Sequence, residues 1–137
     1  MKLLQSSKFL LLILYLSATL ARGDVGRAAH YSPPYIPTAC NGNDPSQFPS
    51  NNLFAAAGEG IWDNGSACGR RYLVRCISAT VFGTCKLGQT IQVTIVDRAY
   101  RAVSRPSSND ATIVLSTTAF ENIARAAAWV NIEYVEV

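Results

Sequence analysis

The chain has 137 residues, of which 12 are Lys or Arg and 9 are Asp or Glu. Cleavage of a leader after Gly23 would remove Lys2, Lys8 and Arg22 and leave equal numbers of basic and acidic residues. A chain this close to neutral has no long-range attraction for nucleic acid, and residues 24–137 are enough for one domain. We therefore expect a single, monomeric domain at residues 24–137 with no nucleic-acid partner.

The first residues have the pattern of a secretory leader. Two lysines precede the apolar run 9–16, and small residues that suit a signal peptidase follow it. The run is too short to cross a bilayer comfortably, so a signal anchor is the minor alternative and we expect no stable membrane insertion. We predict a signal peptide at residues 1–23, cleaved near Ala21 or Gly23, and an extracellular protein of the apoplast or cell wall.

The first half of the remaining chain mixes short strands with loops. Residues 27–32 are extended, and the prolines that follow keep residues 31–38 in an open path. Residues 41–52 are rich in Asn, Gly, Pro and Ser, which predicts a surface loop. The apolar run 53–57 fits either a buried strand or a short helix. A turn at residues 63–65 then precedes a strand at residues 72–77.

The second half contains the clearest periodicity. Residues 90–96 alternate, which places Ile91, Val93 and Ile95 on one face of a strand, and Asp97 follows that strand. Residues 111–116 form the next strand-like run. Ser116 can cap a helix from Thr117 to about Ala127, and Thr118 and Glu121 have the spacing of a capping box. Residues 130–137 close the chain as a strand, so several short strands and one helix predict a small barrel.

All four cysteines follow the leader: Cys40, Cys68, Cys76 and Cys85. An even number of cysteines in a secreted chain predicts two disulfides, although spacing cannot choose among the three connectivities. A zinc site is disfavoured because no two cysteines are closely spaced and His30, the single histidine, lies far upstream. We expect no metal and no cofactor.

Five runs carry a resemblance to a known family: YSPPYIPTAC (31–40), NLFAAAG (52–58), IWDNGSACG (61–69), IQVTIVDRA (91–99) and ATIVLSTTAF (111–120). They closely resemble plant natriuretic peptides, also called endoglucanase-45-like domain proteins, over essentially the whole mature chain. That family resembles the first domain of expansins. The resemblance implies a mainly β fold, a disulfide-stabilised six-stranded double-psi β-barrel with one or two short helices. It also implies pairing of Cys40 with Cys68 and of Cys76 with Cys85.

The chemistry of sugar cleavage is incomplete in this sequence. Glycoside hydrolysis generally needs two carboxylates that face the scissile bond. Asp97 matches one acidic position of the expansin groove, whereas Val114 stands where the second aspartate would be. His30 could substitute as an acid or base, but a strand histidine bonded to the backbone is the favoured interpretation. We therefore predict that the chain is not an enzyme.

Binding residues are predicted in three groups. The groove candidates are Asp97, Tyr100, Tyr31 and His30. Flat aromatic faces can stack on sugar rings, and the aromatic candidates for this role are Tyr31, Tyr35, Trp62, Tyr72 and Tyr100. The receptor-contact candidates are Tyr35, Pro37, Asn43 and Asp44. A sequon at residues 64–66 makes Asn64 a possible glycosylation site, although the same residues also make a good turn.

Two functions from different classes follow from the resemblance. The first is a secreted, non-enzymatic signalling protein that is similar to plant natriuretic peptides and acts in water and ion homeostasis through a cell-surface receptor. The second is an expansin-like module that binds or loosens cell-wall polysaccharide without hydrolase activity.

Overall fold

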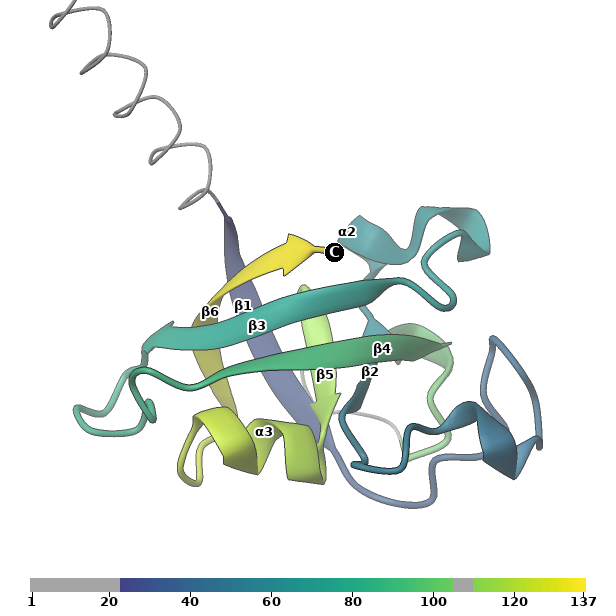
Figure 1. Ribbon diagram of the computed structural model, residues 1–137, viewed down its shortest axis with the longest axis horizontal. Helices are drawn as coiled ribbons and strands as arrows, with labels where there is room; N and C mark the ends of the chain where they lie inside the picture. The colour runs from purple at the N-terminus through teal and green to yellow at the C-terminus, as the bar shows by residue number, and fades with distance from the viewer. Residues whose placement is uncertain (1–22, 105–109) are drawn as a thin grey trace, which may run out of the picture.

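The computed structural model describes residues 23–104 and 110–137, and its centre is a closed barrel of six strands (Figure 1). The strands are β1 (Asp24–Tyr31), β2 (Phe54–Ala57), β3 (Arg71–Ser78), β4 (Thr90–Arg98), β5 (Ile113–Ser116) and β6 (Trp129–Glu136). Their order around the barrel is β1-β5-β2-β4-β3-β6. The β1–β5 and β2–β4 pairs are parallel and the other four pairs are antiparallel. Except for Gly23, the predicted leader lies outside the described residues.

Strand β4 shows why the alternating pattern predicted a core face. Ile91, Val93 and Ile95 are at most 8% exposed and lie in the main hydrophobic core, as the alternation predicted. The strand is two residues longer than expected and ends at Arg98. Asp97 therefore lies inside β4 and not in the loop after it. The ambiguous run 53–57 is also resolved, since β2 is a fully buried strand.

A second, smaller core lies on the other side of the sheet from the main one. Its buried members are Ala29, Tyr31, Phe54, Ala56, Val96, Ala102, Ala111 and Val114. Strand pairing aligns Val114 with Ala29 and with Ala56, and aligns Ala56 with Asp97. The resulting row across four strands contains one carboxylate among three aliphatic side chains.

The helices are short. They are α2 (Glu59–Trp62), α3 (Thr117–Ile123) and the 3-10 turns η1 (Pro45–Gln47), η2 (Asp63–Gly65) and η3 (Ala99–Arg101). Among the described residues, no helix has the length and apolar character needed to cross a membrane.

Helix α3 begins as the sequence predicts but ends four residues earlier. Ser116 is its N-cap, and the Ser116 hydroxyl accepts a hydrogen bond from the Ala119 N–H at 3.2 Å. The expected capping box at Thr118 is wrong, because the helix is already capped two residues before it. Ala124 is extended and bridges to Cys85, which ends the helix and leads the chain towards β6.

The segment 32–53, which we call the strap, crosses the second core between β1 and β2. Tyr35 and Phe48 of the strap pack their rings on Phe54, with centroid distances of 4.8 and 4.7 Å. A disulfide joins Cys40 of the strap to Cys68. A second disulfide, Cys76–Cys85, closes the connection between β3 and β4, and both pairings are those that the resemblance implies.

Candidate functional site

Asp97 is the one carboxylate of the row across the four strands, and it is completely buried. Its Oδ1 accepts hydrogen bonds from the backbone N–H groups of Ala39 and Arg98, both at 2.8 Å. Its Oδ2 is buried and has no hydrogen-bond partner among the described residues. Burial raises the pKa of Asp97, and the two backbone bonds partly oppose that shift. The expected groove exposure of Asp97 is therefore wrong, and this side chain cannot touch a ligand in this conformation.

Tyr31 is also interior, with 3% of its surface exposed. Its hydroxyl is buried without a partner within the described part of the chain. Burial raises the pKa of Tyr31, and the nearby charge of Asp97 raises it further. The ring packs against Tyr35 and Phe54 in the second core, so Tyr31 offers no face to a sugar ring and is not a groove residue.

Val114 and His30 do not supply a second acid beside Asp97. Val114 is fully buried in the second core. His30 contacts Phe120 on α3, with a centroid distance of 4.5 Å, and its Nε2 lies 2.9 Å from the Ala127 carbonyl oxygen. This is the backbone-bonded strand histidine that the sequence favoured. Across residues 23–104 and 110–137, no three His, Cys, Asp or Glu side chains are placed to hold a metal ion.

A surface groove of about 350 Å³ lies directly above Asp97. It is lined by Pro37, Thr38, Ala39, Trp62, Arg98, Arg101 and Val103. Ala39 and Arg98 both line this groove and donate their backbone N–H groups to the carboxylate below it. Asp97 therefore holds the strap and the end of β4 together beneath the groove.

Arg98 lines the groove and lies near two aromatic rings. Its guanidinium carbon lies 5.6 Å from the ring centroid of Trp62 and 5.8 Å from that of Tyr100. Glu59 binds the same guanidinium with both oxygens, at 2.8 Å to Nε and 2.9 Å to Nη2. This bond lowers the pKa of Glu59, which keeps the carboxylate charged and the guanidinium in place. The Arg98 side chain therefore pairs with Glu59, and only its backbone N–H bonds to Asp97.

The remaining candidates lie at different depths. Tyr35 is half-buried, and its hydroxyl donates to the Tyr31 carbonyl oxygen at 3.2 Å, so it packs inward and is not a free receptor contact. Pro37, Asn43 and Asp44 are exposed on the strap, where Asp44 accepts the Ser46 N–H at 2.9 Å and caps η1.

The aromatic candidates and the sequon are similarly divided. Tyr72 is 5% exposed, whereas Tyr100 is 77% exposed and Trp62 lines the groove. Asn64 is exposed and has a left-handed backbone, with φ of 51°. Of the five aromatic candidates, Trp62 and Tyr100 both lie within 6 Å of the Arg98 guanidinium carbon, at 5.6 and 5.8 Å, and Trp62 also lines the groove.

Glu59 and Arg98 were missed as site residues because no linear pattern joins them. They are 39 positions apart and meet because β2 and β4 pair in parallel, which aligns Ala57 with Arg98. The carboxyl ends of parallel strands lie at the same edge of a sheet, so the residues that follow them converge. Glu59 lies two residues past the end of β2 and Arg98 is the last residue of β4, so the missed signal was the charged residue at the carboxyl end of each strand.

Comparison with known proteins identifies the family. A double-psi β-barrel family model described as lytic transglycolase matches residues 54–134. An EG45-like domain containing protein of Citrus jambhiri is 38% identical over 125 residues, which cover 87% of this chain and 86% of the relative. EG45-like domain containing protein 2 of Arabidopsis thaliana is 38% identical over 112 residues, which cover 81% and 78%. The chain belongs to the EG45-like domain containing protein family. The predicted double-psi barrel is confirmed.

Solved expansins have a similar fold. The structure of apo Clavibacter michiganensis expansin aligns with a TM-score of 0.58 at 21% identity. A point mutant of Clavibacter michiganensis expansin, in complex with cellohexaose, aligns with a TM-score of 0.60 at 24% identity. Each alignment covers 85% of this chain and 50% of the expansin, so the chain spans half the length of these proteins.

Proposed function

We propose that this chain is a secreted module that binds cell-wall polysaccharide without cutting it. The observation that carries the proposal is the surface row Trp62–Arg98–Tyr100, in which Glu59 fixes the central guanidinium. Aromatic rings offer flat apolar faces to pyranose rings, and a fixed guanidinium offers several N–H donors to sugar hydroxyl or carboxylate oxygens. The cellohexaose complex of a similarly folded expansin supports a glucan chain as one ligand to test.

Extracellular action agrees with the cysteines. The two disulfides, Cys40–Cys68 and Cys76–Cys85, use every cysteine of the sequence. Disulfides persist in oxidising compartments and are rare in the cytosol. This distribution supports the predicted secretion into the apoplast or cell wall, and amino-terminal sequencing of the exported protein tests cleavage near Ala21 or Gly23.

The burial of Asp97 and the lack of a second acid in its row support binding without cleavage. The oxygens of Asp97 are buried, and Val114, which lies two strands away in the same row with Ala56 between them, cannot transfer a proton. The family description names a lytic transglycolase, so cleavage is tested directly. Reducing ends or new chain termini released by the pure protein, and abolished in Asp97→Ala, would contradict the proposal.

A sedimentation assay with insoluble and immobilised glycans tests the binding itself. The native protein is mixed with cellulose, xylan and pectin, and the bound fraction is compared with those of Trp62→Ala and Tyr100→Ala. We expect each variant to lose about fivefold or more in affinity for the bound glycan, since stacked aromatic rings carry much of sugar recognition. Phe82→Ala, which removes an exposed ring from a loop outside the groove, is the matched control. Equal binding by all four proteins would contradict a role for the groove.

Signalling through a cell-surface receptor, as in plant natriuretic peptides, is the second candidate. The observation that favours it is the exposed strap surface at Pro37, Asn43 and Asp44, which the Cys40–Cys68 disulfide fastens to the barrel. A preordered loop loses little entropy when it binds a receptor. Protoplast swelling separates the two candidates, because protoplasts have no wall. A volume response that the variant Asn43→Ala/Asp44→Ala loses would favour signalling over glycan binding.

A further inference from the structure

The loop between β3 and β4 exposes three apolar side chains that the proposed glycan site does not use. Phe82 is 103% exposed, Leu87 is 75% exposed and Val81 is 69% exposed. We call these three residues the apolar tip. The loop projects from one end of the barrel, as Figure 1 shows. A soluble domain usually buries such a group, so a cluster of this kind marks an interaction surface.

The loop holds the apolar tip in place by covalent and hydrogen bonds. The Cys76–Cys85 disulfide closes its base. The Thr84 hydroxyl donates to the Val81 carbonyl oxygen at 2.8 Å, and Arg125 donates from Nη1 to the Gly83 carbonyl oxygen at 2.9 Å. Because these bonds fix the loop in its exposed form, a partner that binds the tip loses little affinity to ordering the loop.

The charges around the apolar tip are basic. Residues 78–90 contain Lys86 and no acidic residue. Lys86 and Arg125 have no carboxylate partner within ion-pair distance in the part of the chain that the structure describes. Lys86 does contact an acidic residue, Glu121 on α3. The bond is to the backbone, because Lys86 Nζ donates to the Glu121 carbonyl oxygen at 2.6 Å and not to its carboxylate.

We propose that the apolar tip inserts into the interfacial region of a lipid bilayer, with Lys86 and Arg125 against the headgroup phosphates. A convex tip needs no complementary pocket in a bilayer, which accepts Phe and Leu side chains below its headgroups. Lys86 and Arg125, which have no carboxylate partner among the described residues, lie beside the tip and can contact the phosphate groups of the lipid headgroups. This contact is peripheral and requires no membrane-spanning segment.

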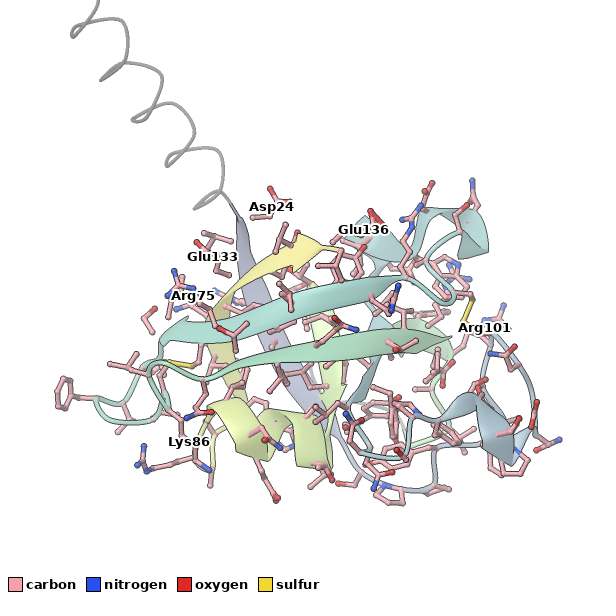
Figure 2. The ribbon with its side chains drawn as sticks, in the orientation of Figure 1. Asp24, Arg75, Lys86, Arg101, Glu133 and Glu136 are labelled. Carbon is pink, nitrogen blue, oxygen red and sulfur yellow. A yellow bond between two sulfur atoms is a disulfide. The ribbon has the colours of Figure 1, made fainter. Side chains whose placement is uncertain are left out.

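The apolar tip lies away from the groove, so the protein could contact a bilayer and a glycan at the same time. Figure 2 labels Lys86 beside the loop and Arg101 beside the groove, and they lie at opposite ends of the barrel. A molecule docked on lipid through the tip would therefore keep the groove of the proposed glycan site turned away from the bilayer. The lipid contact does not depend on glycan binding, and either can fail alone.

A second copy of the chain is the competing occupant. A hollow of about 280 Å³ beside the loop is lined by Ala79, Thr80, Val81, Thr84, Ala126, Ala127, Ala128 and Trp129. It could receive Phe82 from a second copy. The bilayer is favoured because the flanking cations Lys86 and Arg125 would meet their own like charges across a symmetric dimer.

Co-sedimentation with vesicles tests the proposal on the mature protein. Vesicles of phosphatidylcholine alone are compared with mixed vesicles that contain phosphatidylserine, since anionic lipid attracts cations near the surface. We expect the native protein to bind the mixed vesicles, Phe82→Ser to lose about tenfold or more in partitioning, and Lys86→Gln to lose about fivefold. Val25→Ser, which removes another exposed apolar side chain from β1, should bind as the native protein does.

A second measurement reports the depth of the tip. The Phe82→Trp variant should show a blue-shifted emission on adding mixed vesicles and quenching by brominated lipid chains, beyond the signal of the native tryptophans. Failure of the native protein to bind vesicles, or unchanged binding by Phe82→Ser, would overturn the proposal. A dimer in sedimentation velocity that Phe82→Ser dissociates, without vesicle binding, would assign the tip to a second copy instead. Retained glycan binding by Phe82→Ser would show that the two surfaces act separately.

Discussion

The backbone N–H of Ala39 donates to Asp97 Oδ1 across 2.8 Å, although the two residues are 58 positions apart. This bond ties the strap to the end of β4 beneath the groove. The same oxygen accepts the Arg98 N–H, so one carboxylate positions two neighbouring parts of the groove wall. Asp97 therefore acts on the site from below and supports the residues that we propose contact sugar.

Replacing Asp97 should separate hydrogen bonding from charge. In Asp97→Ala, the N–H groups of Ala39 and Arg98 lose their acceptor, so we expect unfolding to become easier by about 2–4 kcal/mol. In Asp97→Asn, the amide oxygen can still accept both bonds, so the free energy of unfolding at pH 7 should stay within about 1 kcal/mol of the native value. Urea denaturation measures both. Equal and large losses in the two variants would show that the charge itself is required.

The pH dependence of stability follows from the raised pKa of Asp97. Burial raises it above its ordinary value of 3.8. Between that value and the raised one, the folded protein binds more protons than the unfolded chain, so this group makes stability fall as the pH rises. We expect the native protein to lose stability over this window relative to Asp97→Asn, which cannot titrate there. Parallel curves of unfolding free energy against pH for the two proteins would contradict this assignment.

Restoring an acid at Val114 should not restore cleavage. Val114 is fully buried, and its neighbours across the strands are Ala29 and Ala56, which offer no hydrogen-bond donor side chain. Val114→Asp would bury a second carboxyl group in the same row as Asp97, so we expect a loss of about 3 kcal/mol or more in stability. We expect no release of reducing ends from glycans by the folded fraction. Val114→Asn, a matched polar change without a proton to transfer, is the control, and cleavage seen with Asp alone would show an accessible latent site.

Glu59 should affect glycan binding through Arg98. Its carboxylate holds the guanidinium between Trp62 and Tyr100. Glu59→Gln removes the charge from this bidentate contact, so we expect glycan affinity to fall about threefold to tenfold with little change in stability, because the pair lies at the surface. Isothermal titration with the glycan that sediments the native protein measures the change. Glu133→Gln, which breaks the surface pair with Arg75 on β3, is the control and should bind normally.

Periodicity could predict the strands of this fold but not the closure of the site. The alternation of Ile91, Val93 and Ile95 defines a strand with one buried face, and burial of that face is a local consequence of the pattern. The exposure of Asp97 is not local. It depends on whether the strap covers the end of β4, and that depends on Cys40, on the packing of Phe48 and on one backbone hydrogen bond from Ala39.

The length of α3 is a second feature that local sequence could not predict, because tertiary contacts decide it. The sequence predicts a helix from Thr117 to about Ala127, and the helix forms only as far as Ile123. Beyond it, the bridge between Ala124 and Cys85 and the bond from the Lys86 N–H to the Ile123 carbonyl oxygen at 2.8 Å compete with helical bonds. Both are contacts with the β3–β4 loop, so tertiary pairing ends the helix where local propensity alone would continue it.

The two disulfides should differ in their effect on the groove. Cys40–Cys68 closes 28 positions of sequence and Cys76–Cys85 closes 9, so in the chain-entropy picture their removal costs about 3–4 and about 2–3 kcal/mol respectively.

The paired serine variant at Cys40 and Cys68 frees the strap, which carries Pro37, Thr38 and Ala39 of the groove wall. We expect it to lose glycan affinity even where it remains folded by circular dichroism. The paired serine variant at Cys76 and Cys85 should keep glycan affinity and lose vesicle binding, because it loosens the apolar tip alone. If glycan affinity survives in the first variant and disappears in the second, the glycan site lies near the β3–β4 loop and not at the groove, which would contradict the proposed site.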